Sequence, residues 1–375
     1  MKNPDTLLQA HKTSAMRCCY LLFPILMTLH SPLHAQPDSL SSLQLSAYVD
    51  VYYSYDFNRP ANNSRPAFIY NHHRHNEVNL NLAFVKAAWQ QRRVRANLAL
   101  MAGTYANANL AGEPGVLRNV FEANAGIKLH PKKNLWIDAG IFASHIGFES
   151  AISKDCWTLT RSILAENSPY YEAGAKLTYQ TDDGKWLLSG LVLNGWQRIT
   201  RVDGSTLPAF GTQLQYRPNE KTLLNYSTFI GSNDPDSVRR MRYFHNLYGQ
   251  WQLSSKTGLI IGFDWGLQQR SRGSQRYQQW FSPVLMLRQQ LTEKWFVAGR
   301  LEYYSDPHEV MIGTASRRGF STWGGSVNLD YQVLPQCIWR TEWKLYSSEN
   351  AVFTKRVAEP VRQNMMAATA IAIQF

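Results

Sequence analysis

The sequence predicts an all-β protein, a transmembrane antiparallel up-and-down β-barrel of about sixteen strands. Three observations predict this fold. The N-terminus has the features of a secretory signal, long segments alternate between apolar and polar residues, and short and long breaks follow one another regularly between those segments. Alternation with a period of two places the two sets of side chains on opposite faces of a strand.

The N-terminal segment reads as a signal peptide. Basic residues precede an apolar run from Cys18 to Leu33, and the small residue Ala35 follows it. A basic flank, a short apolar stretch and a small residue at the exit are the parts of a secretory signal. We therefore expect residues 1–35 to be removed and residues 36–375 to form a single outer-membrane domain.

The composition of the remaining chain narrows the choice of class. Lys and Arg fall from 39 to 36 and Asp and Glu from 27 to 26, so the mature chain carries a charge of +10. Its two cysteines, Cys156 and Cys337, are too few for a disulfide framework. No later stretch approaches about 18 consecutive apolar residues, so no membrane-spanning helix is expected. A secreted chain that is 13% aromatic is then either a soluble all-β domain or a barrel in the outer membrane.

Residues 43–57 show the alternation most clearly. Apolar side chains such as Leu43, Leu45 and Val51 fall on one face, and polar ones such as Gln44 and Asp50 fall on the other. This segment is much longer than the about five or six residues of a typical globular strand. The same alternation recurs over residues 77–84, 121–129, 171–179, 339–345 and 371–375.

Two kinds of break separate these segments. The seven short ones contain the Pro, Asn, Asp, Gly and Lys of tight turns and lie near residues 90–93, 131–134, 181–185, 218–221, 254–256, 291–294 and 334–336. The eight long ones lie near residues 58–74, 106–118, 149–168, 197–209, 233–242, 270–276, 306–319 and 349–362. These breaks predict sixteen strands with both ends on the short-turn side, as in single-chain outer-membrane barrels, and one misplaced break would give fourteen or eighteen.

A membrane barrel explains these features better than a soluble sandwich or propeller does. Only helices and closed sheets can satisfy every backbone polar group in lipid. Sandwich strands are shorter, and sandwiches lack the regular succession of short and long breaks. Aromatic residues near the predicted strand ends suit the two interfacial girdles of a barrel, and they include Tyr53, Trp89, Trp136, Trp186, Trp251, Trp280 and Trp295.

A barrel of about sixteen strands leaves an aqueous channel, which the polar strand faces would line. The charged residues on those faces are the pore-lining candidates: Asp50, Glu77, Glu122, Lys128, Asp138, Glu172, Lys176, Arg300, Glu302, Arg340, Glu342 and Lys344. Acidic and basic groups are mixed, so we expect a lumen of mixed charge.

The longest predicted loop, residues 149–168, is a candidate for narrowing the channel. It contains Arg161 and Glu166, which we expect to help set the constriction if the loop folds inward. The alternative is a surface loop packed on its neighbours.

Residues 160–174 read Thr-Arg-Ser-Ile-Leu-Ala-Glu-Asn-Ser-Pro-Tyr-Tyr-Glu-Ala-Gly. Together with the opening strand Ala47-Tyr48-Val49-Asp50 and the terminal Phe375, this segment resembles the OmpL-like β-barrel porin family over most of the mature chain. The resemblance implies an outer-membrane location and the passage of solutes, and it brings no defined substrate and no catalytic residues. Phe375 resembles the terminal aromatic signal that the barrel-assembly machinery reads.

Arginine is concentrated in the predicted long loops. Three interpretations remain open: pairing with lipopolysaccharide phosphates, attraction of anionic solutes to the channel mouth, or a solvated charged rim. The secretory signal argues against nucleic acid as the partner. The residues concerned are Arg59, Arg65, Arg74, Arg198, Arg201, Arg239, Arg240, Arg242, Arg270, Arg272, Arg276, Arg317, Arg318, Arg356 and Arg362.

Neither a metal site nor a catalytic site is expected, and no cofactor is expected. His72, His73 and His75 are close in sequence, but Arg74 between them disfavours a bound cation. Linear hydrolase, zinc-protease and phosphate-loop motifs are missing from the mature sequence, and the neighbours Ser144 and His145 are the one pair to inspect.

The sequence therefore predicts a porin-like channel for passive diffusion of small polar solutes and not an enzyme. Two alternatives remain. One is an outer-membrane barrel hydrolase, which a convergent Ser, His and acid arrangement would favour. The other is a structural or adhesive barrel with a plugged lumen.

Overall fold

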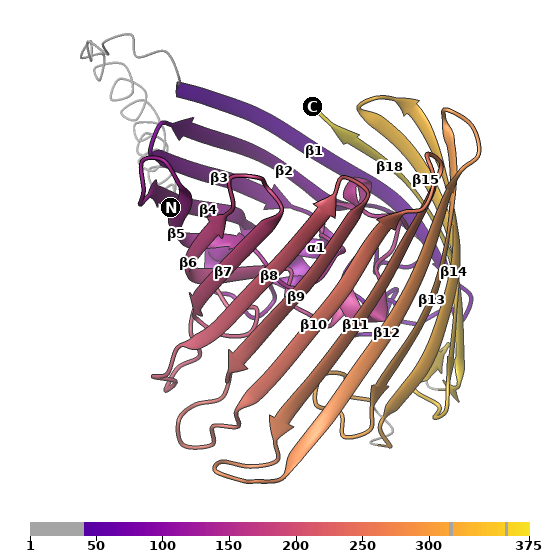
Figure 1. The fold of residues 1–375 in the computed structure, drawn as a ribbon. Coiled ribbons are helices and arrows are strands. Elements are labelled where there is room, and N and C mark those ends of the chain that lie inside the picture. Colours follow the sequence, from indigo (N-terminus) through magenta and orange to yellow (C-terminus); the bar gives the residue numbers. More distant parts are fainter. Residues whose placement is uncertain (1–40, 315–317, 357–358) are drawn as a thin grey trace, which may run out of the picture. The chain divides into compact units, whose positions relative to one another are not determined.

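The computed structural model describes residues 41–314, 318–356 and 359–375. The expected signal peptide, residues 1–35, and the loop residue Arg317 lie outside the described residues. Sixteen antiparallel strands close into a barrel, which confirms the predicted fold class and strand number (Figure 1). Residues from Ser42 to Phe375 form one compact unit.

The barrel strands are β1 Ser41–Asp56, β2 Val78–Gln91, β3 Val94–Ala102, β4 Val120–Lys128, β5 Asn134–Ala143, β6 Tyr171–Gln180, β7 Trp186–Leu193, β8 Ala209–Asn219, β9 Thr222–Gly231, β10 Arg242–Gln252, β11 Thr257–Gln269, β12 Tyr277–Gln290, β13 Trp295–Asp306, β14 Phe320–Leu334, β15 Cys337–Ser348 and β18 Gln363–Gln374. A separate hairpin, β16 Phe353–Lys355 and β17 Glu359–Val361, belongs to the last long loop. The helical turns are α1 Thr104–Asn109, η2 Gly115–Asn119, η3 Ser153–Asp155 and α2 Ile163–Glu166. None of these helices, within the described ranges, is long and apolar enough to cross a membrane.

Each strand pairs with its sequence neighbours, and β1 pairs with β18 to close the ring. In this seam Tyr48 lies opposite Gln374 and Asp56 lies opposite Met366. Ala47 and Phe375 extend the seam by exchanging two backbone hydrogen bonds, of 2.6 and 2.9 Å. Closure leaves no strand edge of the barrel unpaired, and a sheet must meet this condition to span a lipid bilayer.

Exposure along the strands follows the predicted alternation. On β14, Trp323 and Val327 face outward and are 55% and 59% exposed, whereas Asn328 and Asp330 face inward and are buried. The outward face therefore carries the apolar side chains, which is the reverse of a soluble barrel and suits contact with lipid.

Aromatic pairs gather on the outer face near both ends of the strands. Trp186 stacks on Tyr216 with ring centroids 4.1 Å apart near the short turns, and Tyr303 lies 4.8 Å from Trp323 toward the long loops. These pairs are placed where the interfacial girdles of a membrane barrel lie.

Two of the aromatics predicted for the girdles face the interior instead. Trp136 and Trp280 are 5% and 1% exposed. The Arg95 guanidinium lies 4.2 Å from the Trp136 ring centroid, and the Arg242 guanidinium lies 5.5 Å from that of Trp280. The girdle prediction was wrong here because closeness to a strand end does not set the face. The alternation sets it, and it places both residues on inward positions.

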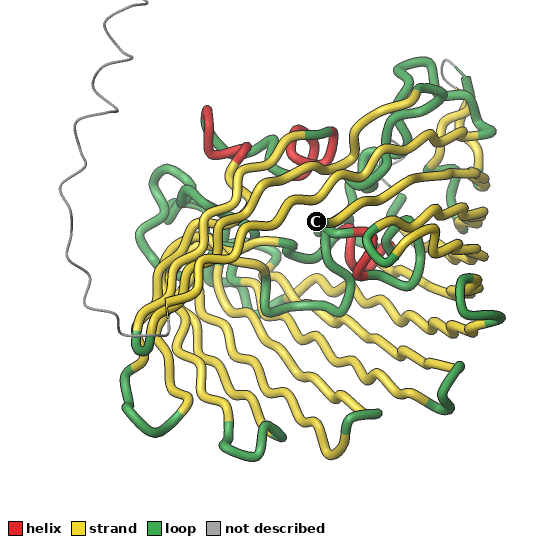
Figure 2. Tube along the Cα trace, turned by 90° about the horizontal axis from the view of Figure 1, so that it is seen from above, coloured by secondary structure: helices red, strands yellow, loops and turns green. Residues whose placement is uncertain are grey.

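The long loops do not all stay at the rim. Seen from above, loop segments and a helix lie within the ring of strands (Figure 2). Tyr105 of α1 and Leu164 of α2 belong to one buried cluster with Leu82 of β2 and Tyr48 of β1. Loops thus fill part of the lumen, and one of them crosses it.

Candidate channel constriction

The loop formed by residues 144–170, which joins β5 to β6 and is called here the inward loop, spans the lumen. On one side, Tyr48 of β1 shares a 2.8 Å hydrogen bond with Ser153. On the other side, the Gly147 N–H donates to Asn246 of β10 at 3.1 Å. Because β1 and β10 lie almost opposite each other in the strand order, the loop reaches across the barrel.

Backbone N–H groups of the inward loop bind polar side chains of three adjacent strands. Leu159 donates to the Asn328 side-chain oxygen on β14 at 2.9 Å. Thr160 donates to the Glu342 carboxylate on β15 at 2.6 Å, and Ile163 donates to the Glu302 carboxylate on β13 at 2.5 Å. Buried backbone donors need such partners, so these wall side chains fix the loop in the lumen.

Basic side chains of the wall bind the carbonyl groups of the same loop. Arg300 donates to the Thr160 carbonyl at 2.8 Å, and Arg340 donates to the Cys156 carbonyl at 2.9 Å. The Lys344 ammonium donates to the Arg161 carbonyl at 2.8 Å. The mixed charges of the wall therefore serve both the donors and the acceptors of one loop backbone.

The charged wall residues also pair with one another, which compensates for their burial. Arg300 lies 2.8 Å from Glu342, Lys344 lies 2.9 Å from Glu302, and Arg340 lies 2.8 Å from Asp330. Glu149 of the loop adds a contact of 3.4 Å to Arg300. Buried charges of this kind persist only when each has partners of opposite sign and hydrogen bonds for its remaining polar atoms.

The structure divides the twelve pore-lining candidates into four groups. Arg300, Glu302, Arg340, Glu342 and Lys344 come together beneath the inward loop and are buried. These five therefore hold the loop in place and do not face an open channel.

Asp50 and Glu172 form a second group, in which each carboxylate is buried against a histidine. Asp50 lies 3.0 Å from the His72 Nε2 atom, and Glu172 lies 2.8 Å from the His145 Nδ1 atom. These contacts tie the first long loop and the inward loop to the wall.

The third group borders a cavity. Glu122, Asp138 and Lys176 line a cavity of about 410 Å³, which also contacts Ser42 at the start of β1. Arg95 pairs with Asp138 at 2.5 Å, and the Lys176 ammonium lies over the Phe142 ring, 4.7 Å from its centroid.

The remaining two candidates lie near the ends of strands. Lys128 is the partly exposed last residue of β4. Glu77 precedes β2 and pairs with Arg74 at 2.8 Å, so the structure places it in the first long loop and not on a strand.

Arg161 and Glu166 lie in the inward loop, but neither carries its charge to an open surface. Arg161 donates to carbonyls of its own loop, those of Ser150 at 2.5 Å, Leu159 at 2.7 Å and Ala151 at 3.2 Å. Its role in the structure is to hold the shape of the loop.

Glu166 fastens the inward loop to the first long loop. Its carboxylate accepts from the Tyr70 N–H at 2.9 Å and from the Asn71 N–H at 3.2 Å. Burial raises the pKa of Glu166 to about 7, and these two backbone donors and Arg161 oppose that rise.

The histidines and the Ser144–His145 pair have ordinary structural partners. His73 shares a hydrogen bond with the Tyr70 carbonyl at 3.1 Å, and His75 accepts from the Asp56 N–H at 2.9 Å. Among the described residues, no cluster of three or more His, Cys, Asp or Glu side chains could hold a metal ion. Both ring nitrogens of His145 are engaged, by Glu172 and by the Thr228 carbonyl at 2.9 Å, while the Ser144 hydroxyl accepts from the Ile146 N–H at 3.0 Å.

Sequence reasoning missed the neutral residues that anchor the inward loop. Tyr48, Asn246 and Asn328 all lie on inward-facing strand positions and are fully or almost fully buried. Their alternation marks them as interior. Only the folded loop shows what they bind, because their partners are about a hundred or more positions away in sequence.

A closed sixteen-stranded barrel with an apolar exterior, many charged and polar residues in its interior and a loop across the lumen defines a porin-like β-barrel. Residues 42–375 match the model of the family described as "Putative beta-barrel porin-2, OmpL-like". The chain belongs to this family, and the resemblance noted in the sequence is thereby confirmed. A comparison with curated proteins finds no match.

Solved porins and channels share the fold at low sequence identity. The anion-selective porin from Comamonas acidovorans superposes with a TM-score of 0.59 at 9% identity, covering 90% of this chain and 100% of that one. The outer membrane channel DcaP of Acinetobacter baumannii gives 0.60 at 7%, covering 91% and 99%. Salmonella typhi OmpF gives 0.58 at 8%, covering 89% and 97%. The likeness concerns the fold.

Proposed function

We propose that this porin-like barrel is a passive channel for small polar solutes across the outer membrane. The observation that carries the proposal is the interior itself. Sixteen strands enclose a lumen whose inward faces carry many polar and charged side chains, and cavities of about 390 and 410 Å³ lie toward its two ends. A barrel of this strand number is wide enough for an aqueous path, and the inward loop is the element that restricts it.

In this proposal the short turns face the periplasm and the long loops face outward, as in other outer-membrane barrels. Outer-membrane lipid surrounds the apolar face, and Phe375 engages the barrel-assembly machinery. Part of the basic rim is already paired, since Arg240 lies 2.8 Å from Asp234 and Arg239 lies 3.2 Å from Asp236. Lipopolysaccharide phosphates would then bind exposed arginines such as Arg272 and Arg276.

The direct test is reconstitution of the purified barrel in a planar lipid bilayer. We expect discrete current steps in salt solution, and a salt gradient would report the charge preference from the reversal potential. A protein that is folded by circular dichroism and inserted in the bilayer but never conducts would refute the channel.

A second candidate is a barrel plugged by its own loops. The burial of Arg300, Glu302, Arg340, Glu342 and Lys344 beneath the inward loop favours it. A plugged barrel conducts ions only after the loop is removed, whereas a constricted channel conducts both before and after. The conductance of the intact protein therefore distinguishes the two candidates.

A further inference from the structure

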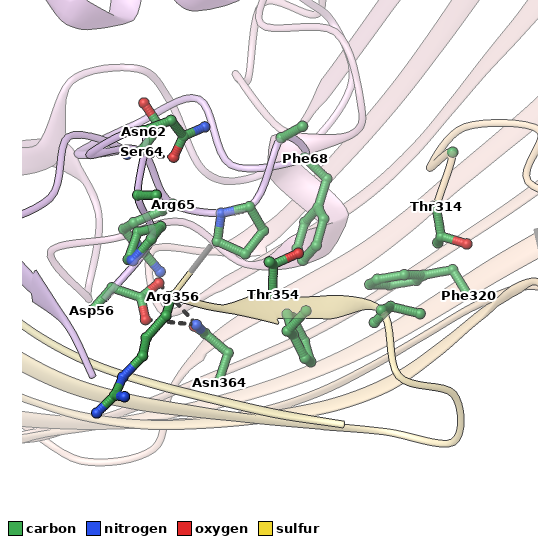
Figure 3. A pocket seen from close by; sticks show the side chains of 17 residues that line it. Asp56, Asn62, Ser64, Arg65, Phe68, Thr314, Phe320, Thr354, Arg356 and Asn364 are labelled. Carbon is green, nitrogen blue, oxygen red and sulfur yellow. Dashed lines mark hydrogen bonds between the residues drawn. The ribbon is translucent and has the colours of Figure 1, made fainter. Parts of the chain in front are cut away.

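The cavity of about 390 Å³ lies at the long-loop end of the barrel and contains a polar side and an apolar side (Figure 3). Residues of the first long loop, of the β13–β14 loop and of the β15–β18 loop line it. Its size falls within the range of small-ligand sites. Figure 3 shows Arg65 and Asp56 on one side of the cavity and Phe320 on the other.

Arg65 is the unusual residue of this cavity. It is 3% exposed, and its Nε, Nη1 and Nη2 atoms all lack a hydrogen-bond partner within the described part of the chain. An unpaired buried guanidinium is costly, whereas Arg300 and Arg340 each have carboxylate partners. Such an orphaned group calls for a missing anion or water as its partner.

The neighbouring acid does not supply that partner. Both carboxylate oxygens of Asp56 accept from the Asn364 side-chain amide at 2.8 Å, and one also accepts from the Asn58 N–H at 2.9 Å. Arg356 is the other charged residue in the lining, and its side chain extends away from Arg65 and Phe320 (Figure 3).

The Tyr346 hydroxyl is also buried without a hydrogen-bond partner among the described residues, but it is not part of the cavity lining. The planar guanidinium fork of Arg65 by itself matches the two oxygens of a carboxylate.

The other side of the cavity is apolar. Phe68, Phe320, Val352 and Phe353 line it, and the Phe68 and Phe320 rings meet edge to face with centroids 4.9 Å apart. Aromatic rings of this kind pack favourably against a further ring. The cavity therefore offers an anion site beside an aromatic wall.

We infer that this cavity is a docking site for a small aromatic monocarboxylate, with Arg65 binding the carboxylate and the wall around Phe68 holding the ring. The inference rests on the proposed channel and names a class of solute for it.

The position of the cavity supports a role in binding solute on its way through the barrel. Asp56 in its lining and Ser42 in the lining of the other cavity lie at opposite ends of β1, and the inward loop binds Tyr48 between them. A solute entering from the long-loop side would therefore meet Arg65 before the constriction.

Benzoate is a suitable probe, with acetate and benzyl alcohol as comparisons that lack the ring or the charge. Calorimetric titration of the full barrel in detergent should show saturable benzoate binding and much weaker binding of both comparisons. In the bilayer, benzoate added on the long-loop side should reduce the salt current. Arg65→Gln should weaken benzoate binding by about 10-fold or more, the usual effect of removing a charged hydrogen-bond donor.

Arg272→Gln is the matched control, since it removes the same charge from an exposed loop position outside the cavity lining. Circular dichroism checks that each variant is folded. Equal effects of the two variants, or no benzoate binding by the folded native barrel, would overturn the inference. Absence of current while benzoate still binds through Arg65 would refute the channel and leave the docking site standing.

Discussion

Single buried charges decide how this barrel is organised. Arg300 illustrates the rule, since it contacts Glu342 at 2.8 Å and Glu149 at 3.4 Å and also donates to the Thr158 hydroxyl at 2.7 Å. Each charged group that joins the wall to the inward loop in this way is stabilised in its buried position by its partners. Removing one member leaves the others buried without compensation.

Replacing Arg300 by Met should therefore destabilise the barrel by about 3–5 kcal/mol, because Glu302 and Glu342 would remain buried with less compensation. Denaturant unfolding in lipid vesicles, followed by tryptophan fluorescence, measures the change. Lys133→Ala is the control, since its ion pair with Asp182 at 2.6 Å is exposed to solvent and should leave the unfolding midpoint unchanged. If Arg300→Met left the free energy of unfolding unchanged, the charged network would not be what holds the inward loop.

Glu166 should make the attachment of the inward loop depend on pH. Its pKa is raised from the ordinary 4.5 to about 7 in the folded protein, so the folded state holds the proton more tightly than the unfolded state does. The stabilisation that this group contributes is complete below the ordinary pKa. It is lost as the pH rises through about 7, since the carboxylate must then be charged while buried.

Hydrogen exchange measures this effect at the Tyr70 and Asn71 amides, which donate to Glu166. We expect their protection, corrected for the intrinsic rate, to fall between about pH 4.5 and about pH 7.5 in the native protein. In Glu166→Gln the fall should vanish. The same fall in both proteins would assign it to another group.

At the scale of elements, the strands form the wall of the barrel and the inward loop crosses its lumen. Replacing residues 152–166 by a short Gly-Ser linker should raise the single-channel conductance severalfold, because the loop would no longer cross the lumen at Tyr48. It would also leave the charged side chains of Arg300, Arg340 and Glu342 facing water. Shortening the exposed loop at residues 271–274 should leave the conductance unchanged. An unaltered current in the first variant would mean that the narrowest point lies elsewhere.

The strands could be predicted from the sequence, whereas the contacts of the inward loop could not, and the reason is physical. Alternation and turn residues are local, so residues 43–57 and the short and long breaks already define the strands, their faces and their number. The burial of Arg340 and Glu342 is not local, because it depends on Cys156 and Thr160, more than 180 positions away. Alternation shows that these charges face inward, and only the folded loop shows that they are covered.

At the scale of the whole molecule, the barrel exchanges the usual positions of apolar and polar residues. Leu301, Trp323 and Val327 lie outside and exposed, while Asp330 and Arg340 lie inside and buried. This arrangement is stable only if lipid surrounds the wall, since water would face a continuous apolar belt. The surroundings of the wall can therefore be tested by a pair of equally exposed valines.

Val327 lies at the middle of β14 and is 59% exposed, and Val238 lies in the β9–β10 loop and is 57% exposed. If lipid covers the wall, Val327→Arg should destabilise the vesicle-inserted barrel by about 2–4 kcal/mol, the cost of a guanidinium near the bilayer midplane. Val238→Arg should have little effect, because the loop position meets water. Both free energies of unfolding come from denaturant titration in the same vesicles. Equal and small changes at the two positions would show that the outer face of the barrel is not in contact with lipid, because exposure alone is the same at both sites.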